Sequence, residues 1–240
     1  MYEPWILAVA MVVVFLGAAV QGSVGTGFSV VSAPILALLD PDFVPIAPQF
    51  LALIVAVSSL VRERGGLDMA GVGWVIVGRI PGSLAAAAVL TYAVARTLDF
   101  LIGGIVLIAV LVLMSGVRVP LTTGTRIVAG AFSGFSGTAS SIGGPPIALL
   151  YRDQTGPTVR ATLGVIFSVG IVINLIVLTA TGILDRDDII TAAMLAPATT
   201  LGFAGSSLLH KRVEGNILRR GILVVAAVSA IALLARASFG

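Results

Sequence analysis

Long runs of hydrophobic residues, separated by short groups of glycine, proline and charged residues, follow one another along the whole chain. Several runs reach about 18 residues or more, and a helix needs about 20 apolar residues to cross a bilayer. Because the runs are continuous rather than alternating, they predict helices and not the strands of a membrane barrel. The segments expected are 5–21, 27–39, 43–61, 69–91, 98–116, 122–134, 143–151, 161–182, 188–209 and 216–235.

The composition places the chain among all-α polytopic membrane proteins, with one transmembrane domain over residues 1–240. Hydrophobic residues make up 58% of the chain and charged residues only 10%, and the mean hydropathy is +1.13. The isoelectric point near 10.0 is explained by basic residues in cytoplasmic loops, so nucleic-acid binding is not expected. The chain has no cysteine, which excludes disulfides and thiolate metal sites. We expect neither a metal nor a cofactor.

Two polar breaks within the apolar pattern resemble each other. Residues 21–39 read QGSVGTGFSVVSAPILALL, and residues 133–151 read SGFSGTASSIGGPPIALLY. When the two are aligned, two glycines, a threonine, a proline and an isoleucine coincide. Broken hydrophobic segments in corresponding positions of two halves are typical of secondary transporters and indicate their substrate site. The sequence therefore predicts an internal repeat of residues 1–117 and 118–240.

The distribution of basic residues favours a hairpin at each break. If each broken pair crossed the membrane once, basic residues would divide almost evenly between the two sides. If each pair is a re-entrant hairpin, most basic residues share one side, as the positive-inside rule expects. Each half then holds five segments, and because this number is odd, the second half is inserted upside down relative to the first, as an inverted repeat. Both termini lie on the side opposite most of the basic residues, which is the non-cytoplasmic side. The shared side would carry Arg62, Arg64, Arg118, Arg126, Arg152, Arg160, Lys211, Arg212, Arg219 and Arg220, and the other side Arg96, Arg186 and Arg236.

The two breaks are expected to form a binding site for an anion. Lipid cannot satisfy exposed backbone groups, so such breaks persist only beside protein or a water-filled cavity. Two helix N-termini facing that cavity would hold an anion without a formal charge. For individual serines and threonines, helix packing is the alternative. The candidate residues are Gly22, Ser23, Gly25, Thr26, Gly27, Gly134, Ser136, Gly137, Thr138, Ser140, Ser141, Gly143 and Gly144.

Three polar residues inside apolar segments complete the candidate site. Arg79 lies well inside segment 69–91, and an ionisable residue within a membrane segment is a functional candidate by default. Its alternative role is to extend to the membrane interface. Gln49 and Asn174 lie in the segments that follow the two hairpins. Their side chains are expected either to donate hydrogen bonds to the oxygen atoms of an oxyanion or to join neighbouring helices.

The acidic residues fall in the connections or at the edges of segments. Cation transporters and proton relays normally keep a carboxylate inside the membrane, so the substrate is expected to be anionic or neutral. Asp185, Asp187 and Asp188 form a cluster that would suit a divalent metal. We expect this cluster, and Asp68 in the first half, to cap the helices that follow instead.

Three stretches resemble the TauE/SafE family, also called sulfite exporters or TSUP permeases: GAAVQGSVGTGFSVVSAPIL (17–36), GAFSGFSGTASSIGGPPIALLY (130–151) and VRATLGVIFSVGIVIN (159–174). The resemblance implies transport of sulfite, sulfonates and related small anions across the bacterial inner membrane. The first copy departs from the fuller Gly-Gly pattern and has Phe28 after Gly27, whereas the second keeps Gly143-Gly144. We expect Phe28 to shape the pocket.

The expected function is secondary transport of a small anion by alternating access, with sulfite or an organosulfonate such as sulfoacetate as substrate. An anion channel is the alternative. An intramembrane lipid-modifying enzyme is disfavoured, because the chain has no cysteine, one histidine in a loop and no buried pair of carboxylates. The partners are the anion and the lipid bilayer. Coupling to a proton or another ion, the direction of transport and a homodimer stay open.

Overall fold

The computed structural model describes residues 2–25, 27–62, 66–115, 117–154, 157–210 and 215–239, and their regular structure is helical. The predicted all-α fold is therefore confirmed. The elements are α1 (Pro4–Val24), α2 (Phe28–Leu39), η1 (Pro41–Phe43), α3 (Ile46–Arg62), α4 (Met69–Thr91), α5 (Ala95–Met114), α6 (Thr123–Ser140), α7 (Gly144–Leu150), α8 (Pro157–Ala180), α9 (Arg186–His210) and α10 (Gly215–Phe239).

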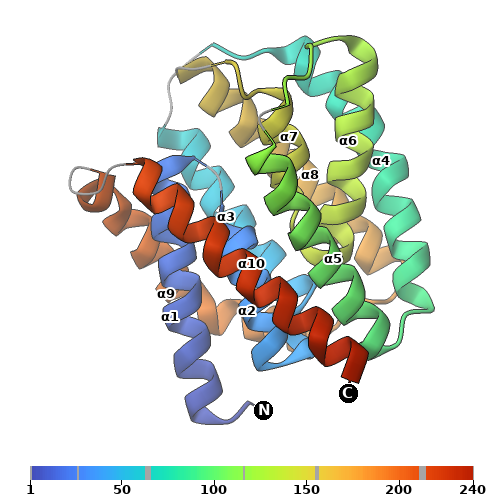
Figure 1. Cartoon of the computed structure of the whole chain (residues 1–240), viewed down its shortest axis with the longest axis vertical. Coiled ribbons are helices and arrows are strands. Elements are labelled where there is room, and N and C mark those ends of the chain that lie inside the picture. The colour runs from blue at the N-terminus through green and yellow to red at the C-terminus, as the bar shows by residue number, and fades with distance from the viewer. Residues whose placement is uncertain are drawn as a thin grey trace.

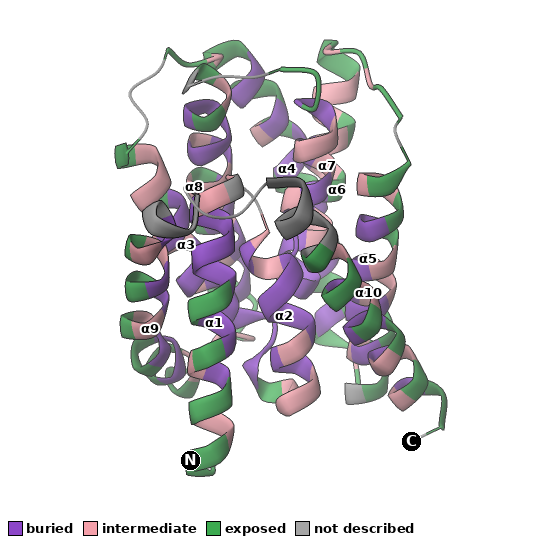
Figure 2. Ribbon diagram, turned by 60° about the vertical axis from the view of Figure 1, so that its left-hand side comes forward, coloured by how far each residue is buried: buried purple, intermediate pink, exposed green. Residues whose placement is uncertain are grey.

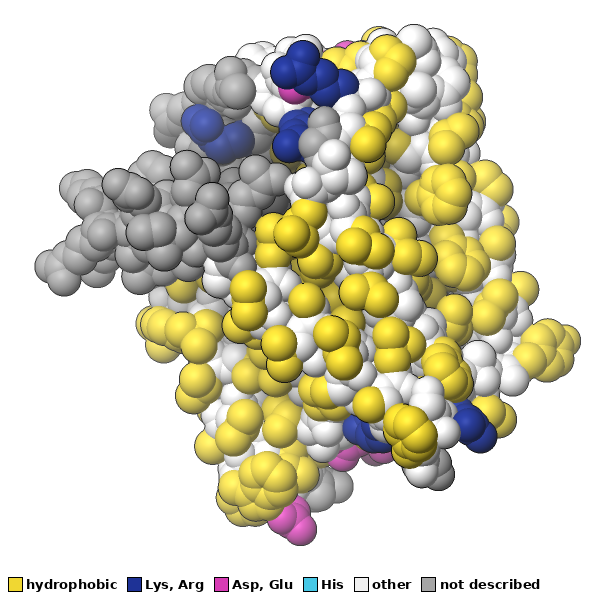
Figure 3. All heavy atoms as spheres, viewed as in Figure 1, with side chains coloured by type: hydrophobic (Ala, Val, Ile, Leu, Met, Phe, Trp, Pro, Cys, Tyr) yellow, Lys and Arg dark blue, Asp and Glu magenta, His cyan; other side chains and the backbone are white. Residues whose placement is uncertain are grey.

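The described helices suit a membrane. Five of them, α1, α4, α5, α8 and α9, contain stretches long and apolar enough to cross a bilayer. Apolar stretches in α2, α3 and α10 are shorter. Hydrophobic side chains cover the middle of the face in Figure 3, and charged side chains lie toward its two ends. The short helix α2 lies inside and is buried along most of its length (Figure 2).

Each broken pair of helices returns to the end of the molecule at which it started (Figure 1). At the end that carries both termini, the ring of Tyr2 stacks on Phe43 with centroids 4.3 Å apart, so α1 starts where α2 finishes. At the opposite end, Arg118 before α6 forms an ion pair of 3.8 Å with Asp153 after α7. The hairpins α1–α2 and α6–α7 thus enter from opposite ends, as the distribution of basic residues predicts.

We call these ends the terminal end and the basic end. The basic end carries Arg118 and Arg126, and Arg126 donates to Asp68 at 2.7 Å. Asp68 caps α4 by accepting from the Gly71 N–H at 2.8 Å, which confirms the predicted cap. At the terminal end, the Asp188 N–H donates to Asp185 at 3.0 Å, which confirms the cap expected for α9.

The helices pack in matching pairs across the two halves. Helix α4 of the first half packs on α6 of the second, and α9 of the second packs on α1 of the first. We call α1, α2, α3 and α9 the first bundle, and α4, α6, α7 and α8 the second bundle. The pairs α3–α8 and α5–α10 join the two halves. This arrangement favours the inverted repeat, which stays a prediction.

Glycines bring α4 and α6 into backbone contact. A Cβ added at Gly78 would overlap the Ile127 carbonyl oxygen, and one added at Gly130 would overlap the Val75 carbonyl oxygen. Small residues are the usual means by which membrane helices approach closely, because lipid provides no hydrophobic driving force between them. The α4–α6 contact therefore depends on the absence of side chains at these positions.

Both breaks are shorter than the sequence motifs suggested. The expected helix ends at residues 21 and 134 were wrong, because α1 continues to Val24 and α6 to Ser140. The helices end where the backbone turns left-handed, with φ of 88° at Gly25 and 64° at Ser141. Gly27 has φ of 121°, a conformation that glycine adopts without the cost of a Cβ. Gly22, Ser23, Gly134, Ser136, Gly137, Thr138 and Ser140 remain helical.

Candidate functional site

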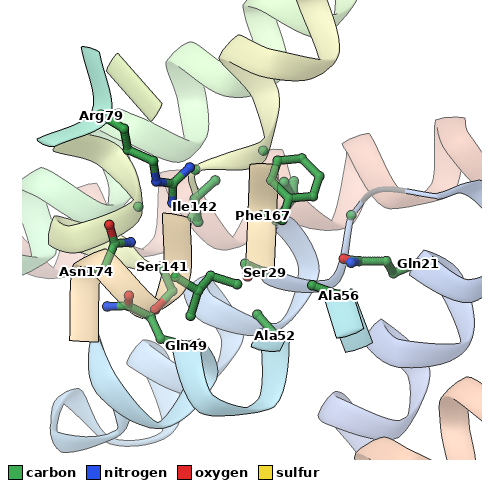
Figure 4. Close-up of a pocket in the computed structure, with 16 residues that line it drawn as sticks. Gln21, Ser29, Gln49, Ala52, Ala56, Arg79, Ser141, Ile142, Phe167 and Asn174 are labelled. Carbon is green, nitrogen blue, oxygen red and sulfur yellow. The ribbon is translucent and has the colours of Figure 1, made fainter. Parts of the chain in front are cut away.

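A polar cavity lies between the two bundles, at the depth of both breaks (Figure 4). The space encloses about 520 Å³, including its opening, and we call it the central cavity. It is lined by Gln21, Gly27, Ser29, Val30, Gln49, Ala52 and Ala56 of the first bundle and its break, and by Arg79, Gly137, Ser141, Ile142, Gly143, Gly144, Phe167, Ile171 and Asn174 of the second.

Arg79 is the charged residue of this lining. Its side chain is only 1% exposed, in the middle of α4, so it does not extend to an interface. Its Nη1 donates to Ser133 Oγ at 2.7 Å, whereas its Nε has no hydrogen-bond partner within the described chain. No ion pair joins Arg79 to a carboxylate among the described residues. A buried charge is costly unless something compensates it.

The guanidinium of Arg79 is held in place from two sides. Ser133 accepts from it and in turn donates to the Gly143 carbonyl at 2.6 Å, which links the arginine to the second break. On α8, a Cβ added at Gly170 would overlap Nε and Cζ of Arg79. The absence of a side chain at Gly170 is therefore what lets the arginine lie against α8.

Two amide side chains accompany the arginine on one side of the central cavity, with Gln21 and Phe167 on the other (Figure 4). Gln49 is 1% exposed, and neither amide atom has a partner in the described structure. Asn174 accepts at Oδ1 from Ser83 Oγ at 2.9 Å, so its Nδ2 donor is directed away from Ser83. A buried amide without partners costs about 1–3 kcal/mol, which a ligand that bonds to it would offset.

The two breaks offer fewer free backbone donors than the sequence suggested. The Phe28 N–H, at the start of α2, already donates to Oε1 of Gln21 at 2.9 Å. Helix α7 has only 7 residues, and Pro145 and Pro146 in its first turn have no N–H. Phe28, Pro145 and Pro146 therefore offer no free N–H to a ligand.

A protein-family model described as Sulfite exporter TauE/SafE matches residues 10–233. The chain belongs to the TauE/SafE family. The matched range includes the second hairpin, the first hairpin from residue 10 onward, and the described lining of the central cavity. Together with the apolar helices, membership makes this TauE/SafE protein a multi-pass membrane transport protein. Searches among curated proteins and among solved structures found no match.

Half of the predicted site residues meet at the central cavity of this TauE/SafE protein. The structure brings together residues that lie far apart in the sequence and places them on five helices and the two breaks. These residues are Gly27, Gln49, Arg79, Gly137, Ser141, Gly143, Gly144 and Asn174.

Most of the remaining predicted residues serve packing. Ser23 donates to the Ala19 carbonyl at 2.8 Å, and Ser136 and Ser140 likewise donate to carbonyls one turn earlier. Such bonds are typical of packed membrane helices. Gly22 packs against Ser206, and Gly134 against the backbone of Arg79.

The last three predicted site residues and Phe28 do not share one role. Thr138 is buried, and its hydroxyl has no partner in the part of the chain described. Gly25 lines a second, smaller cavity. Thr26 lies outside the described residues. Phe28 was expected to shape the pocket, but its ring is fully buried in the core and does not line the central cavity.

Sequence reasoning missed Gln21, Phe167 and Ile171. Gln21 was recognisable as the polar residue that ends the first apolar run. Phe167 and Ile171 precede Asn174 on α8 by seven and three residues, so all three share one helix face. A search outward from Asn174 at helical spacing would have found both of them.

Proposed function

We propose that this TauE/SafE protein is a secondary transporter of a small oxyanion, with sulfite or an organosulfonate such as sulfoacetate as substrate. The observation that carries the proposal is Arg79, a buried cation without a carboxylate partner among the described residues, in the wall of a polar cavity. An oxyanion would compensate its charge, whereas a cationic substrate would be repelled.

The donor set fits a tetrahedral or pyramidal oxyanion. A guanidinium presents donors in a planar fork that binds two oxygen atoms at once. In this proposal Gln49 and Asn174 donate to the remaining oxygens from α3 and α8. Three helices would then hold one anion, with Arg79 as the only formal charge among these three residues.

The other wall of the central cavity favours an organic anion. Ala52 and Ala56 on α3 face the space together with Phe167 and Ile171 on α8. Apolar surface stabilises a ligand that removes it from water, by about 25 cal/mol per Å². A sulfonate with a short carbon chain would use this wall, whereas sulfite would leave it in contact with water.

The position of the central cavity between the bundles suits alternating access. Gln49 belongs to the first bundle, and Arg79 and Asn174 belong to the second. A rocking of one bundle against the other would open the site to either end while both keep hold of the anion. In this proposal the basic end faces the cytoplasm of a bacterial inner membrane, and both termini face the other side.

Transport by purified protein in liposomes tests the proposal. We expect saturable uptake of sulfoacetate or sulfite that is accelerated by the same anion inside, because a carrier exchanges its substrate. Arg79→Gln should abolish uptake, whereas Arg118→Gln, an exposed arginine paired with Asp153, should not. Flux that does not saturate and shows no counterflow would indicate a channel. Failure of every sulfur oxyanion and carboxylate to move would refute the proposal.

A further inference from the structure

A second cavity lies on the basic side of the central cavity. Its volume is about 320 Å³, including open space, and its lining consists of Gln21, Gly25, Ala56, Ser59, Arg62, Arg160, Gly164 and Phe167. We call it the entrance cavity. Three of these residues, Gln21, Ala56 and Phe167, also line the central cavity, so the two spaces meet at these side chains.

The entrance cavity is basic. Arg62 lies in the last turn of α3, Arg160 lies in the first turn of α8, and none of the described residues that line this space is acidic. The hydroxyl of Ser59 is buried without a partner in the described structure. Two cations and an unused hydroxyl around a small space form an environment that attracts anions.

The described contacts that hold the Arg62 side chain in place involve no carboxylate. Its Nη2 donates to the Gly22 carbonyl at 2.6 Å, and its Nη1 donates to Ser206 Oγ at 3.3 Å. The guanidinium carbon lies 4.9 Å from the centre of the Phe203 ring. These neutral partners orient the guanidinium, and its positive charge remains available to the cavity.

Toward the terminal end, the three helices that supply Gln49, Arg79 and Asn174 pack on one another through apolar side chains. Ile46 at the start of α3 packs with Leu90 at the end of α4 and with Leu178 on α8. All three side chains are buried, and they lie toward the terminal end. The entrance cavity is therefore the polar continuation of the central cavity, and it leads toward the basic end.

We propose that the entrance cavity is a second, weaker anion site, which captures the oxyanion at the basic end before it passes Phe167 to reach Arg79. This inference rests on the proposed function. Clefts lined by one sign of charge raise the local concentration of an oppositely charged ligand and increase its association rate, and salt weakens both effects. The entrance site thus acts on the capture of substrate, and Arg79 acts on its retention.

Initial rates of sulfoacetate uptake in proteoliposomes test the inference, with Arg62→Gln and Arg160→Gln compared with the unchanged protein. Each substitution should raise KM on the order of threefold to tenfold at low ionic strength and leave the maximal rate nearly unchanged. Added salt should shrink the difference. Arg62→Lys should restore most of the KM, because it keeps the charge. Arg118→Gln removes an exposed charge from the same end without touching either cavity, and its KM should stay unchanged.

The outcomes separate the two proposals. If both glutamine variants keep the KM of the unchanged protein while Arg79→Gln is inactive, the entrance site is wrong and the central site stands. If Arg62→Lys behaves like Arg62→Gln, Arg62 acts by holding the Gly22 carbonyl, and its role in capture is refuted. If Arg62→Gln fails to fold, the KM of Arg160→Gln decides. If the unchanged protein moves no anion, the proposed function fails, and the entrance site falls with it.

Discussion

At the scale of single residues, Arg79 is the residue on which the proposed site depends. Its chemistry is fixed by its charge, but its position is fixed by neighbours that carry little chemistry themselves. Ser133 ties it to the second break, and Gly170 leaves room for it beside α8. Positioning by neighbours matters because oxyanion recognition by a guanidinium depends on the direction of its fork.

Gly170→Ala should impair transport although it leaves every polar group in place. The added Cβ would overlap the guanidinium of Arg79, so the side chain of Arg79 has to shift from the position in which it faces the central cavity. We expect transport to fall by at least about tenfold, which corresponds to about 1.4 kcal/mol of lost transition-state stabilisation. Gly104→Ala on α5, where a Cβ would meet no atom within 4 Å, is the matched control. Equal activity of the two variants would contradict the proposed role of Gly170.

Arg79→Lys should retain the protein's fold and lose most of its affinity for the oxyanion. Lysine keeps the charge but presents a point charge instead of a fork, so it cannot bind two oxygens in a plane. We expect KM for sulfoacetate to rise by about tenfold or more, since hydrogen bonds to charged groups contribute about 1.5–3 kcal/mol. Uptake kinetics in liposomes measure the change. A lysine variant with unchanged KM would show that Arg79 acts only through its charge.

At the scale of elements, the breaks and the helix pairs use similar residues for different purposes. Gly25 and Ser141 end helices with a left-handed backbone, and Gly27 precedes the start of α2 with a positive φ. Gly78 and Gly130 stay helical and let α4 and α6 touch. The same residue type therefore contributes either a turn or a contact, depending on which helix lies opposite.

Gly130→Ala should destabilise the protein, whereas Gly73→Ala should not. A Cβ at Gly130 would overlap the Val75 carbonyl oxygen and force α4 and α6 apart, whereas a Cβ at Gly73 would meet nothing within 4 Å. Overpacking of this kind costs typically about 1–3 kcal/mol. The difference in unfolding temperature is measured by heating each variant in detergent and monitoring the loss of its monodisperse peak. Identical unfolding temperatures would show that the α4–α6 contact adjusts without cost.

The cap and ion pair at the basic end join three elements through one carboxylate. Asp68 accepts from the Gly71 N–H, from Arg126 at 2.7 Å and from the hydroxyl of Tyr151 at 3.2 Å. Burial raises the pKa of Tyr151 to about 12, and the negative charge of Asp68 adds to this effect. The phenol is therefore a neutral donor at physiological pH.

Asp68→Asn and Asp68→Ala separate the ion pair from the cap. Asparagine still accepts from the Gly71 N–H but lacks the charge that attracts Arg126, whereas alanine lacks both. Because loss of an N-cap costs typically about 1 kcal/mol, the alanine variant should unfold at a lower temperature than the asparagine variant. Equal unfolding temperatures for the two variants would mean that the cap contributes nothing to α4.

At the scale of the whole molecule, the two bundles and their opposite hairpins define the two ends. Tyr2, Phe43 and the C-terminus share one end, and Arg118, Asp153 and the start of α4 share the other. The central cavity joins the bundles, and the entrance cavity opens the path toward the basic end. In the proposed alternating-access cycle, this arrangement is the state that opens toward the basic end.

Cysteine labelling should place Ser115 and Ser238 on opposite sides of the membrane. The chain has no cysteine of its own, so single substitutions report on sidedness without a background. Both serines are exposed, Ser115 after α5 and Ser238 near the end of α10. In intact cells an impermeant maleimide should label Ser238→Cys, and Ser115→Cys should require permeabilisation. Labelling of both variants from the same side would refute the topology.

The sequence alone determined the membrane class, the helices, the two hairpins, the aspartate caps and Arg79 as a candidate. These features depend on the cost of placing polar groups in lipid, on helical spacing and on the side preference of basic residues, all of which act locally along the chain. Only the tertiary structure decided where the breaks end, that Ser23 and Ser136 pack, and that Phe28 does not line the central cavity. Those outcomes depend on which distant helix lies opposite each residue, and no local pattern carries that information.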